Sequence, residues 1–234
     1  MREQLERTAM LIGEAGVERL AACRVAIFGI GGVGGYAVEA LARVGIGSFT
    51  LIDPDTVSES NINRQLMALH STVGKYKTEV AAARILDINP AASVQTHNLF
   101  FLPENAEEID FSAFDYVVDA VDTVAAKLEI YRRAAAAGVP VVAAMGTGNK
   151  LDPTAFRVAN IEKTEGCPLA RTVRGLCRRE GIRGIKAVFS TEQPTGKTLP
   201  EHGRNIPGSI SFVPAAAGLL LARTVVTDLL ERED

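Results

Sequence analysis

Short apolar runs of strand length alternate along the first 148 residues with segments in which apolar residues recur at the helical period. Such alternation is typical of β-α-β units whose parallel sheet is covered by helices on both faces. It predicts an α/β, Rossmann-like fold with a mainly parallel sheet and an N-terminal helix. The expected strands are 24–29, 48–53, 93–100, 115–121 and 140–146, and the expected helices are 35–45, 77–89 and 125–138.

The regular alternation weakens after residue 148. Residues 149–207 are richer in arginine, glycine and proline, with one further strand candidate at 185–191. We interpret residues 1–148 as the core of one globular domain. Residues 149–234 belong to the same domain and contain first a basic insertion that carries substrate specificity, and then a returning strand and helix. The apolar segment 210–222, which we read as that returning strand and helix, is shorter than the roughly 20 residues that span a membrane. We therefore expect no integral membrane span, while peripheral membrane contact stays open.

Composition narrows the protein class. The chain has 234 residues, 47% of them apolar, and a formal charge of only -3, so no global field indicates a polyanionic partner. Its N-terminus lacks the apolar core of an export signal, which favours a cytoplasmic protein. Three cysteines without a C-x-x-C pair predict neither a disulfide framework nor a zinc site.

A glycine loop stands between the first predicted strand and its helix. Gly29, Gly31 and Gly34 match G-x-G-x-x-G, in which glycines permit a tight turn and close approach to a phosphate at the helix N-terminus. Asp53 follows Gly34 by 19 residues, at the end of the second strand, where a carboxylate can accept hydrogen bonds from a ribose. The loop therefore predicts a nucleotide site, but NAD and ATP fit it equally.

Cations downstream bear on that choice. ATP carries more negative charge than the diphosphate of a dinucleotide and needs cations and usually magnesium. Arg64 and Lys77 are candidates for this role, with Asn61 and Gln65 able to orient Arg64 or to contact phosphate. Charges at this spacing also fit a solvated helix, so the residues alone leave the nucleotide open.

Two aspartates lie at the carboxyl end of the predicted strand 115–121, where ligands bind in open parallel sheets. Asp122 is the candidate magnesium ligand, and we assign Asp119 a structural role. A lone aspartate in such a loop caps a helix about as often as it binds a ligand.

These motifs in this order, GIGGVG (29–34), LIDPDTVSESNINRQ (51–65), VGKYK (73–77) and VVDAVD (117–122), resemble the ubiquitin-activating enzyme superfamily of adenylyltransferases. The resemblance runs from about Leu5 to Thr147 and implies ATP with magnesium. It implies that Asp53 binds the ribose and Asp122 the metal, and that Arg7 reaches the nucleotide of a partner subunit in a homodimer. It further implies a nucleotide loop of Gly29, Gly31, Gly32 and Gly34, and a phosphate region of Asp55, Asn61, Arg64, Gln65 and Lys77.

The second half narrows the resemblance. Residues 149–182, VFSTEQP (188–194) and GSISFVPAAAG (208–218) look like the bacterial tRNA threonylcarbamoyladenosine dehydratases. Some of these carry a cysteine where this chain has Ala187, so we expect no cysteine-dependent step there. The implied reaction is ATP-dependent cyclisation of N6-threonylcarbamoyladenosine at position 37 of tRNA, through activation of the threonyl carboxylate.

Positive charge is concentrated between Arg157 and Lys186, a segment that contains eight basic and three acidic residues. Arg171, Arg174 and Arg178 share one face of a helix, a spacing that suits phosphate contacts, and Arg179 adjoins them. We expect this surface to bind tRNA and no DNA. A solvated helix face remains the alternative.

Two other functions stay open at this point. One is an adenylyltransferase that activates the C-terminal glycine of a small sulfur-carrier protein, and the other is an NAD-linked oxidoreductase or redox-sensing module, which leaves Arg64, Lys77 and Asp122 unexplained. The sequence also leaves open a monovalent cation, a sulfur-relay partner, and whether ATP ends as AMP or ADP.

Overall fold

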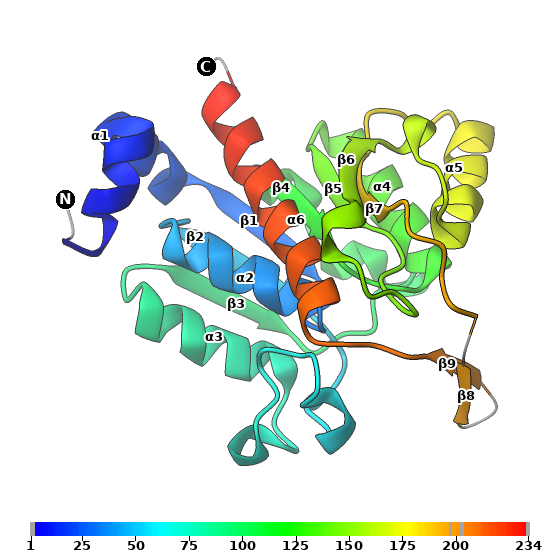
Figure 1. Cartoon of the computed structure of the whole chain (residues 1–234). Coiled ribbons are helices and arrows are strands. Elements are labelled where there is room, and N and C mark those ends of the chain that lie inside the picture. Colours follow the sequence, from blue (N-terminus) through cyan, green and yellow to red (C-terminus); the bar gives the residue numbers. More distant parts are fainter. Residues whose placement is uncertain (1–2, 197, 202–203, 233–234) are drawn as a thin grey trace.

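The computed structural model describes residues 3–196, 198–201 and 204–232. Its centre is a seven-stranded sheet in the order β3-β2-β1-β4-β5-β7-β6, in which every pair is parallel except β6 with β7 (Figure 1). The mainly parallel α/β fold is therefore confirmed. The strands are β1 Arg24–Phe28, β2 Ser48–Ile52, β3 Ser93–His97, β4 Tyr116–Asp119, β5 Val141–Ala144, β6 Phe156–Asn160 and β7 Lys186–Ser190.

Helices cover both faces of this sheet because alternate strand residues are buried against each side. Phe49 and Val118 pack into the core on one face, and Phe28 and Val117 into the core on the other. The first face carries α1 Glu6–Ala22, α2 Gly34–Arg43, α3 Lys77–Ile88 and α6 Phe212–Glu231, and the second carries α4 Val124–Ala137 and α5 Pro168–Glu180.

The second half of the chain enlarges the same sheet. β7 pairs with β5, and β6 adds the antiparallel edge. A separate two-stranded hairpin, β8 Thr198–Glu201 and β9 Arg204–Pro207, follows β7 and precedes α6 along the chain. The strand candidate at 185–191 is confirmed as β7, whereas β6 and the hairpin were not anticipated from the sequence.

The expectation of a strand followed by a helix at 210–222 is wrong. The segment enters α6 at Phe212 without a strand, and the helix continues to Glu231. Pro214 falls in its first turn, where a missing N–H leaves no helical hydrogen bond unmade. By length and composition α6 could cross a membrane, but half of its most apolar 18-residue stretch is buried inside the protein. A buried core helix explains this apolar composition.

Close packing places α6 behind the glycine loop. A Cβ on Gly218 would lie 2.3 Å from the carbonyl oxygen of Val33, so only glycine lets α6 approach α2 at this point. The start of α6 is thereby brought to the loop, where Pro214 lies beside Gly32.

Candidate functional site

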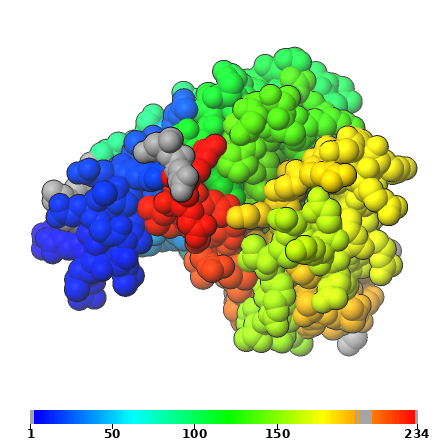
Figure 2. Space-filling model, turned by 90° about the horizontal axis from the view of Figure 1, so that it is seen from above, coloured from blue at the N-terminus to red at the C-terminus, as the bar shows by residue number. Residues whose placement is uncertain are grey.

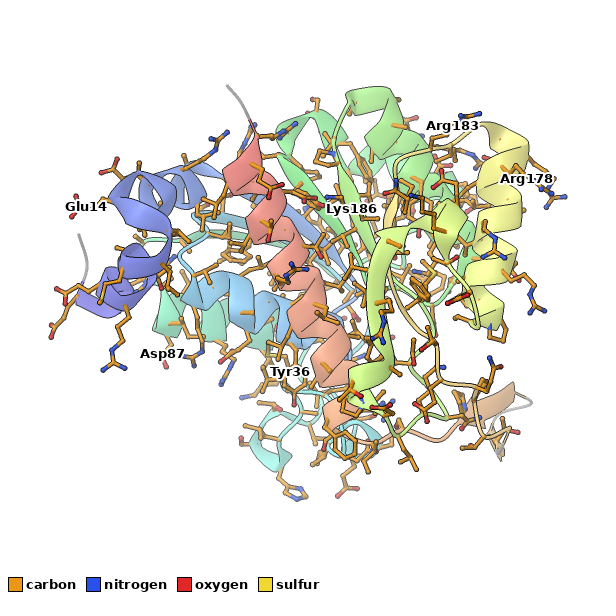
Figure 3. All side chains as sticks on the ribbon, turned by 45° about the horizontal axis from the view of Figure 1, so that its top comes forward. Glu14, Tyr36, Asp87, Arg178, Arg183 and Lys186 are labelled. Carbon is orange, nitrogen blue, oxygen red and sulfur yellow. The ribbon has the colours of Figure 1, made fainter. Side chains whose placement is uncertain are left out.

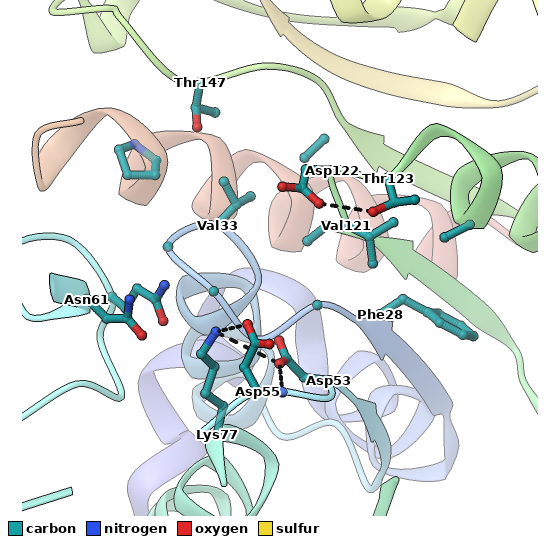
Figure 4. A pocket seen from close by; sticks show the side chains of 18 of the residues that line it. Phe28, Val33, Asp53, Asp55, Asn61, Lys77, Val121, Asp122, Thr123 and Thr147 are labelled. Carbon is teal, nitrogen blue, oxygen red and sulfur yellow. Dashed lines mark hydrogen bonds and ion pairs between the residues drawn. The ribbon is translucent and has the colours of Figure 1, made fainter. Parts of the chain in front are cut away.

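A cavity of about 720 Å³ opens at the carboxyl ends of β1, β2, β4 and β5 (Figure 4). Its size lies within the range usual for small-molecule and cofactor sites. The walls come from the glycine loop, residues 52–65 with Lys77, residues 99–101, the turn after β4, and the segments 144–148 and 207–209.

The glycine loop is shaped by two close backbone approaches. Gly29 has φ +87°, and a Cβ there would lie 2.7 Å from the carbonyl oxygen of Ala120. A Cβ on Gly34 would lie 1.8 Å from the carbonyl oxygen of Gly29, so this glycine sets the turn into α2 without lining the cavity. Gly31 and Gly32 line it. The loop thus presents backbone and a helix N-terminus to the cavity, as an anion site requires.

Asp53, Asp55 and Lys77 form a charged cluster on the floor (Figure 4). Lys77 Nζ lies 2.7 Å from Asp55 Oδ2 and 3.9 Å from Asp53 Oδ1. The two oxygens of Asp53 also accept hydrogen bonds from the N–H groups of Ile30 (2.6 Å) and Asp55 (2.9 Å). Burial raises the pKa of Asp53, which Lys77 and these two bonds partly oppose. Asp53 is therefore tied to the glycine loop, and Lys77 is held under it.

Arg64, Asn61 and Gln65 line the same cavity from the loop after β2. Arg64 donates to the carbonyl of Ser60 (2.9 Å) and to Asn63 Oδ1 (2.8 Å), and makes no ion pair among the described residues. The Asn61 side chain accepts from the Ser58 N–H and so closes its own turn. Gln65 is buried, and its Oε1 has no hydrogen-bond partner among the residues that the structure describes. A buried amide oxygen without a protein partner, on a side chain whose Nε2 lies near Gly31, fits a site completed by a ligand.

The two aspartates after β4 separate. Asp122 lines the cavity and faces the glycine loop, whereas Asp119 is completely buried beneath the turn. Across the part of the chain that the structure describes, no three His, Cys, Asp or Glu side chains converge on a metal site. Asp122 is thus a single carboxylate, which suits an ion held mostly by phosphates and water.

The structure also recruits residues that the sequence analysis did not single out. Thr147, Gly148 and Ser209 line the cavity. Asn149, at φ +59°, joins these segments: its N–H donates to the carbonyl of Gly208 (2.8 Å) and its Oδ1 accepts from the Gly208 N–H (2.7 Å). The glycines directly after β5 were a sequence signal for a second loop at this edge.

Neither Arg7 nor the arginines of α5 line the cavity. Arg7 is an exposed residue of α1. This helix lies at the opposite end of the molecule from α5 (Figure 2). On α5, Arg171, Arg178 and Arg179 are exposed and have no ion-pair partner among the described residues. Figure 3 shows Arg178 extending away from the body of the protein.

Arg174 differs from the other arginines on α5. It is half-buried, and its Nη1 donates to the carbonyl and the hydroxyl of Thr164. Glu180 is also engaged, because both of its carboxylate oxygens accept bonds of 2.7 Å from Arg132 on α4. The one acidic side chain of α5 is therefore exposed but paired, whereas the three exposed arginines of this helix have no ion-pair partner among the described residues.

A family model described as ThiF matches residues 5–234. The chain belongs to the ThiF family. The tRNA threonylcarbamoyladenosine dehydratase of Bacillus subtilis is 40% identical over 244 residues, which covers 99% of this chain and 96% of that protein. A probable adenylyltransferase/sulfurtransferase, MoeZ of Mycobacterium tuberculosis, is 35% identical over 131 residues, covering 56% of this chain and 33% of that protein.

Among solved structures, this ThiF-family fold resembles that of the Escherichia coli tRNA N6-threonylcarbamoyladenosine dehydratase TcdA in complex with ATP. The TM-score is 0.88 at 34% identity, with 98% of this chain and 94% of that chain covered. The cavity at the carboxyl ends of the strands therefore belongs to a fold of which a close relative binds ATP.

Proposed function

We propose that this protein is an ATP-dependent dehydratase that closes a ring in N6-threonylcarbamoyladenosine of tRNA. The observation that carries the proposal is the extent of similarity. Likeness to a tRNA threonylcarbamoyladenosine dehydratase runs through both halves of the chain, whereas likeness to an adenylyltransferase/sulfurtransferase covers 56% of it. The alignment with the first enzyme thus includes the segment that follows residue 148.

The chemistry begins with a carboxylate whose oxygen is a poor leaving group. The threonyl carboxylate attacks a phosphorus of ATP. Attack at the α-phosphorus breaks the bond to pyrophosphate, whereas attack at the γ-phosphorus breaks the bond to ADP, and either leaves a mixed anhydride. The neighbouring carbamoyl group then attacks the activated carbonyl and loses a proton, and the phosphorylated oxygen departs with its bonding electrons. One water is lost in total, and the intramolecular attack is favoured by proximity. No protein nucleophile is needed, and position 187 of this chain is alanine, which cannot supply one.

The residues around the cavity supply what this step requires. We assign the phosphates to the N–H groups of Gly31 and Gly32 and to the side chains of Arg64, Lys77, Asn61 and Gln65, and the ribose to Asp53. Arg64 and Lys77 offset the negative charge that develops as pyrophosphate, or ADP, is displaced from ATP. Lys77 is already desolvated and oriented by Asp55, so little reorganisation accompanies ligand binding.

Magnesium is proposed at Asp122. The carboxylate faces the cavity across from Lys77, where one protein oxygen plus phosphate oxygens make a site typical of this ion. A bound ion would polarise the phosphate oxygens. A monovalent cation and a sulfur-relay partner are not required by these steps and form no part of the proposal.

The tRNA surface is proposed on α5. Leu169 in its first turn lines the cavity, and Arg171, Arg178 and Arg179 extend outward from there. Arg174 contributes by fastening α5 to Thr164. A tRNA substrate also accounts for the expected cytoplasmic location.

The direct test incubates the protein with ATP, magnesium and threonylcarbamoylated tRNA, and then measures the mass of the modified nucleoside. Loss of one water supports the proposal, and an unchanged mass contradicts it. Pyrophosphate exchange that responds to a sulfur-carrier protein and not to tRNA would select the alternative adenylyltransferase. Thermal shift with ATP against NAD separates the oxidoreductase.

The tRNA surface has its own test. Arg178→Glu is expected to weaken tRNA binding and to lower the slope of log affinity against log salt by about one, because one phosphate contact is lost. The matched control is Arg223→Glu, which makes the same change of charge at an exposed position on α6. Equal effects of the two substitutions would refute a specific surface on α5.

A homodimer with composite sites is proposed from Arg7. Its exposure on α1, away from the cavity of its own chain, leaves it available to a second copy. Arg7→Ala and Lys77→Met are each expected to be inactive alone. Mixing the two after exchange of subunits restores activity if a site uses residues of both chains, and restores none if each site is self-contained.

A further inference from the structure

Behind the cavity lies a buried polar cluster of Asp119, Lys127 and Tyr131. Each is completely excluded from solvent. Lys127 Nζ donates to Asp119 Oδ2 at 2.9 Å, and Tyr131 Oη donates to the same oxygen at 2.6 Å. None of the three side chains lines the cavity, so none is assigned to the substrate.

The cluster joins two walls of the cavity. Asp119 Oδ1 accepts from the N–H of Val121 (3.1 Å), which fixes the turn that leads to Asp122. On the other side, Lys127 Nζ donates to the carbonyl of Ala144 (2.8 Å), the first residue of the cavity segment 144–148. One lysine therefore connects the carboxyl ends of β4 and β5.

The same turn also supports the glycine loop. The N–H of Ala120 donates to the carbonyl of Phe28 (2.8 Å). The carbonyl oxygen of Ala120 lies so close to Gly29 that a Cβ on this glycine would be 2.7 Å from it. Movement of the turn at Ala120 would therefore displace Gly29, the first glycine of the loop. Three chain segments that line the cavity are thus coupled to one carboxylate.

Stability alone does not account for these side chains. Burying a lysine and an aspartate costs desolvation free energy that an ion pair repays only with good geometry, and apolar residues often serve as well. What the polar cluster adds is direction, because hydrogen bonds specify where the two strand ends lie. Burial, together with the neighbouring Asp119, raises the pKa of Tyr131 well above its usual value, so the phenol remains a donor.

We propose that Tyr131, Asp119 and Lys127 are positioning residues that hold the turn Ala120–Asp122 and the segment Met145–Gly148 in the geometry that binds ATP. The inference rests on the proposed use of this cavity for ATP. It does not depend on the identity of the carboxylate substrate.

A second cluster of the same composition provides a matched control. Tyr116, at the other end of β4, donates to Asp228 Oδ2 at 2.6 Å, and Lys186 Nζ lies 2.5 Å from Asp228 Oδ1. Tyr116 is as completely buried as Tyr131, but its cluster ties β4 and β7 to α6 and contributes no residue to the cavity. Tyr116→Phe and Tyr131→Phe each remove one hydrogen bond of equal length to a carboxylate.

The experiment measures ATP binding by calorimetry in the presence of magnesium and without tRNA, alongside the unfolding temperature of each variant. Both variants are expected to lose thermal stability, Tyr131→Phe the more of the two, because Asp119 is completely buried whereas the Asp228 side chain is 17% exposed. ATP affinity is expected to fall about tenfold in Tyr131→Phe, as is common for loss of a supporting hydrogen bond behind a site, and to be unchanged in Tyr116→Phe. With tRNA, the effect is expected in KM for ATP and not in KM for tRNA.

Equal ATP affinity in the two variants overturns the proposal. Should Tyr131→Phe fail to fold, Asp119→Asn is measured instead, since it keeps an acceptor for Val121 and loses the charge that holds Lys127. Unchanged ATP affinity in a folded Asp119→Asn overturns the proposal as well. A wild-type protein that binds ATP but does not dehydrate tRNA would refute the proposed reaction and leave this result intact.

Discussion

Lys77→Met tests how the charged cluster on the cavity floor is balanced. The substitution keeps most of the side-chain volume and removes the cation that faces Asp53 and Asp55. The Lys77 and Asp53 side chains are each only 6% exposed, whereas Asp55 is 62% exposed. The effect on folding should therefore come from Asp53, since water stabilises Asp55 without a partner.

The magnitude follows from the distance. Two unit charges about 4 Å apart interact by about 4 kcal/mol at the effective dielectric constant of roughly 20 that suits protein sites. Lys77 Nζ and Asp53 Oδ1 are 3.9 Å apart. Asp53 retains its two N–H donors in the variant, and protonation limits its penalty, so we expect a loss of about 2–3 kcal/mol in the free energy of unfolding at pH 7.

The loss should depend on pH with a definite sign. Burial raises the pKa of Asp53 in the folded protein, and Lys77 is the largest influence that lowers it, so the substitution raises this pKa further. The unfolded chains titrate alike. The difference in stability is therefore fully present above the pKa of Asp53 in the variant and disappears as the pH falls through the pKa in the wild type.

Urea unfolding, followed by circular dichroism from pH 7 down to pH 4, measures this difference. Lys186→Met serves as the control, because its Asp228 partner lies outside the cavity. ATP affinity should fall in Lys77→Met and remain unchanged in the control. A stability difference for Lys77→Met that does not shrink with falling pH would refute the assignment of the effect to Asp53.

Three further outcomes are expected. Gly34→Ala should lower the free energy of unfolding by about 3 kcal/mol or more, because its Cβ would lie 1.8 Å from the carbonyl oxygen of Gly29. Gly175→Ala, which has open space around it in the middle of α5, should raise that free energy by about 0.5–1 kcal/mol. Calorimetric unfolding measures both, and equal changes would contradict the close approach at Gly34. The three cysteines, Cys23, Cys167 and Cys177, are free and buried, and burial raises the pKa of Cys177 to about 11. A thiol reagent at pH 8 should therefore label none of them until urea is added. Rapid labelling of Cys177 in the native protein would be inconsistent with its burial. Glu180→Gln should strengthen tRNA binding slightly, since it removes the acid beside Arg179, and unchanged affinity in filter binding at several salt concentrations would argue against contact between α5 and tRNA.

Local patterns sufficed for the first half of the fold. Strands such as β1 and β2 are short apolar runs bounded by glycine or aspartate, and such runs are recognisable without neighbours. The segment 210–222 was misread because an apolar run with proline fits a buried strand as well as a core helix. Only the contact of Gly218 with α2 decides between them. The strand β6 is half-exposed and irregular in pattern, so it has meaning only as the antiparallel partner of β7.

By itself, the sequence determined the class of fold, the glycine loop, and the order of the polar residues that follow β2 and β4, because each of these depends on spacing within a few residues. Tertiary structure alone decided which of them meet. It placed Lys77 under Asp53, turned Asp119 inward while Asp122 faces the cavity, and tied Arg174 to Thr164 while Arg178 remains exposed. The physical reason is that burial and pairing are properties of segments far apart in the chain, which spacing does not encode.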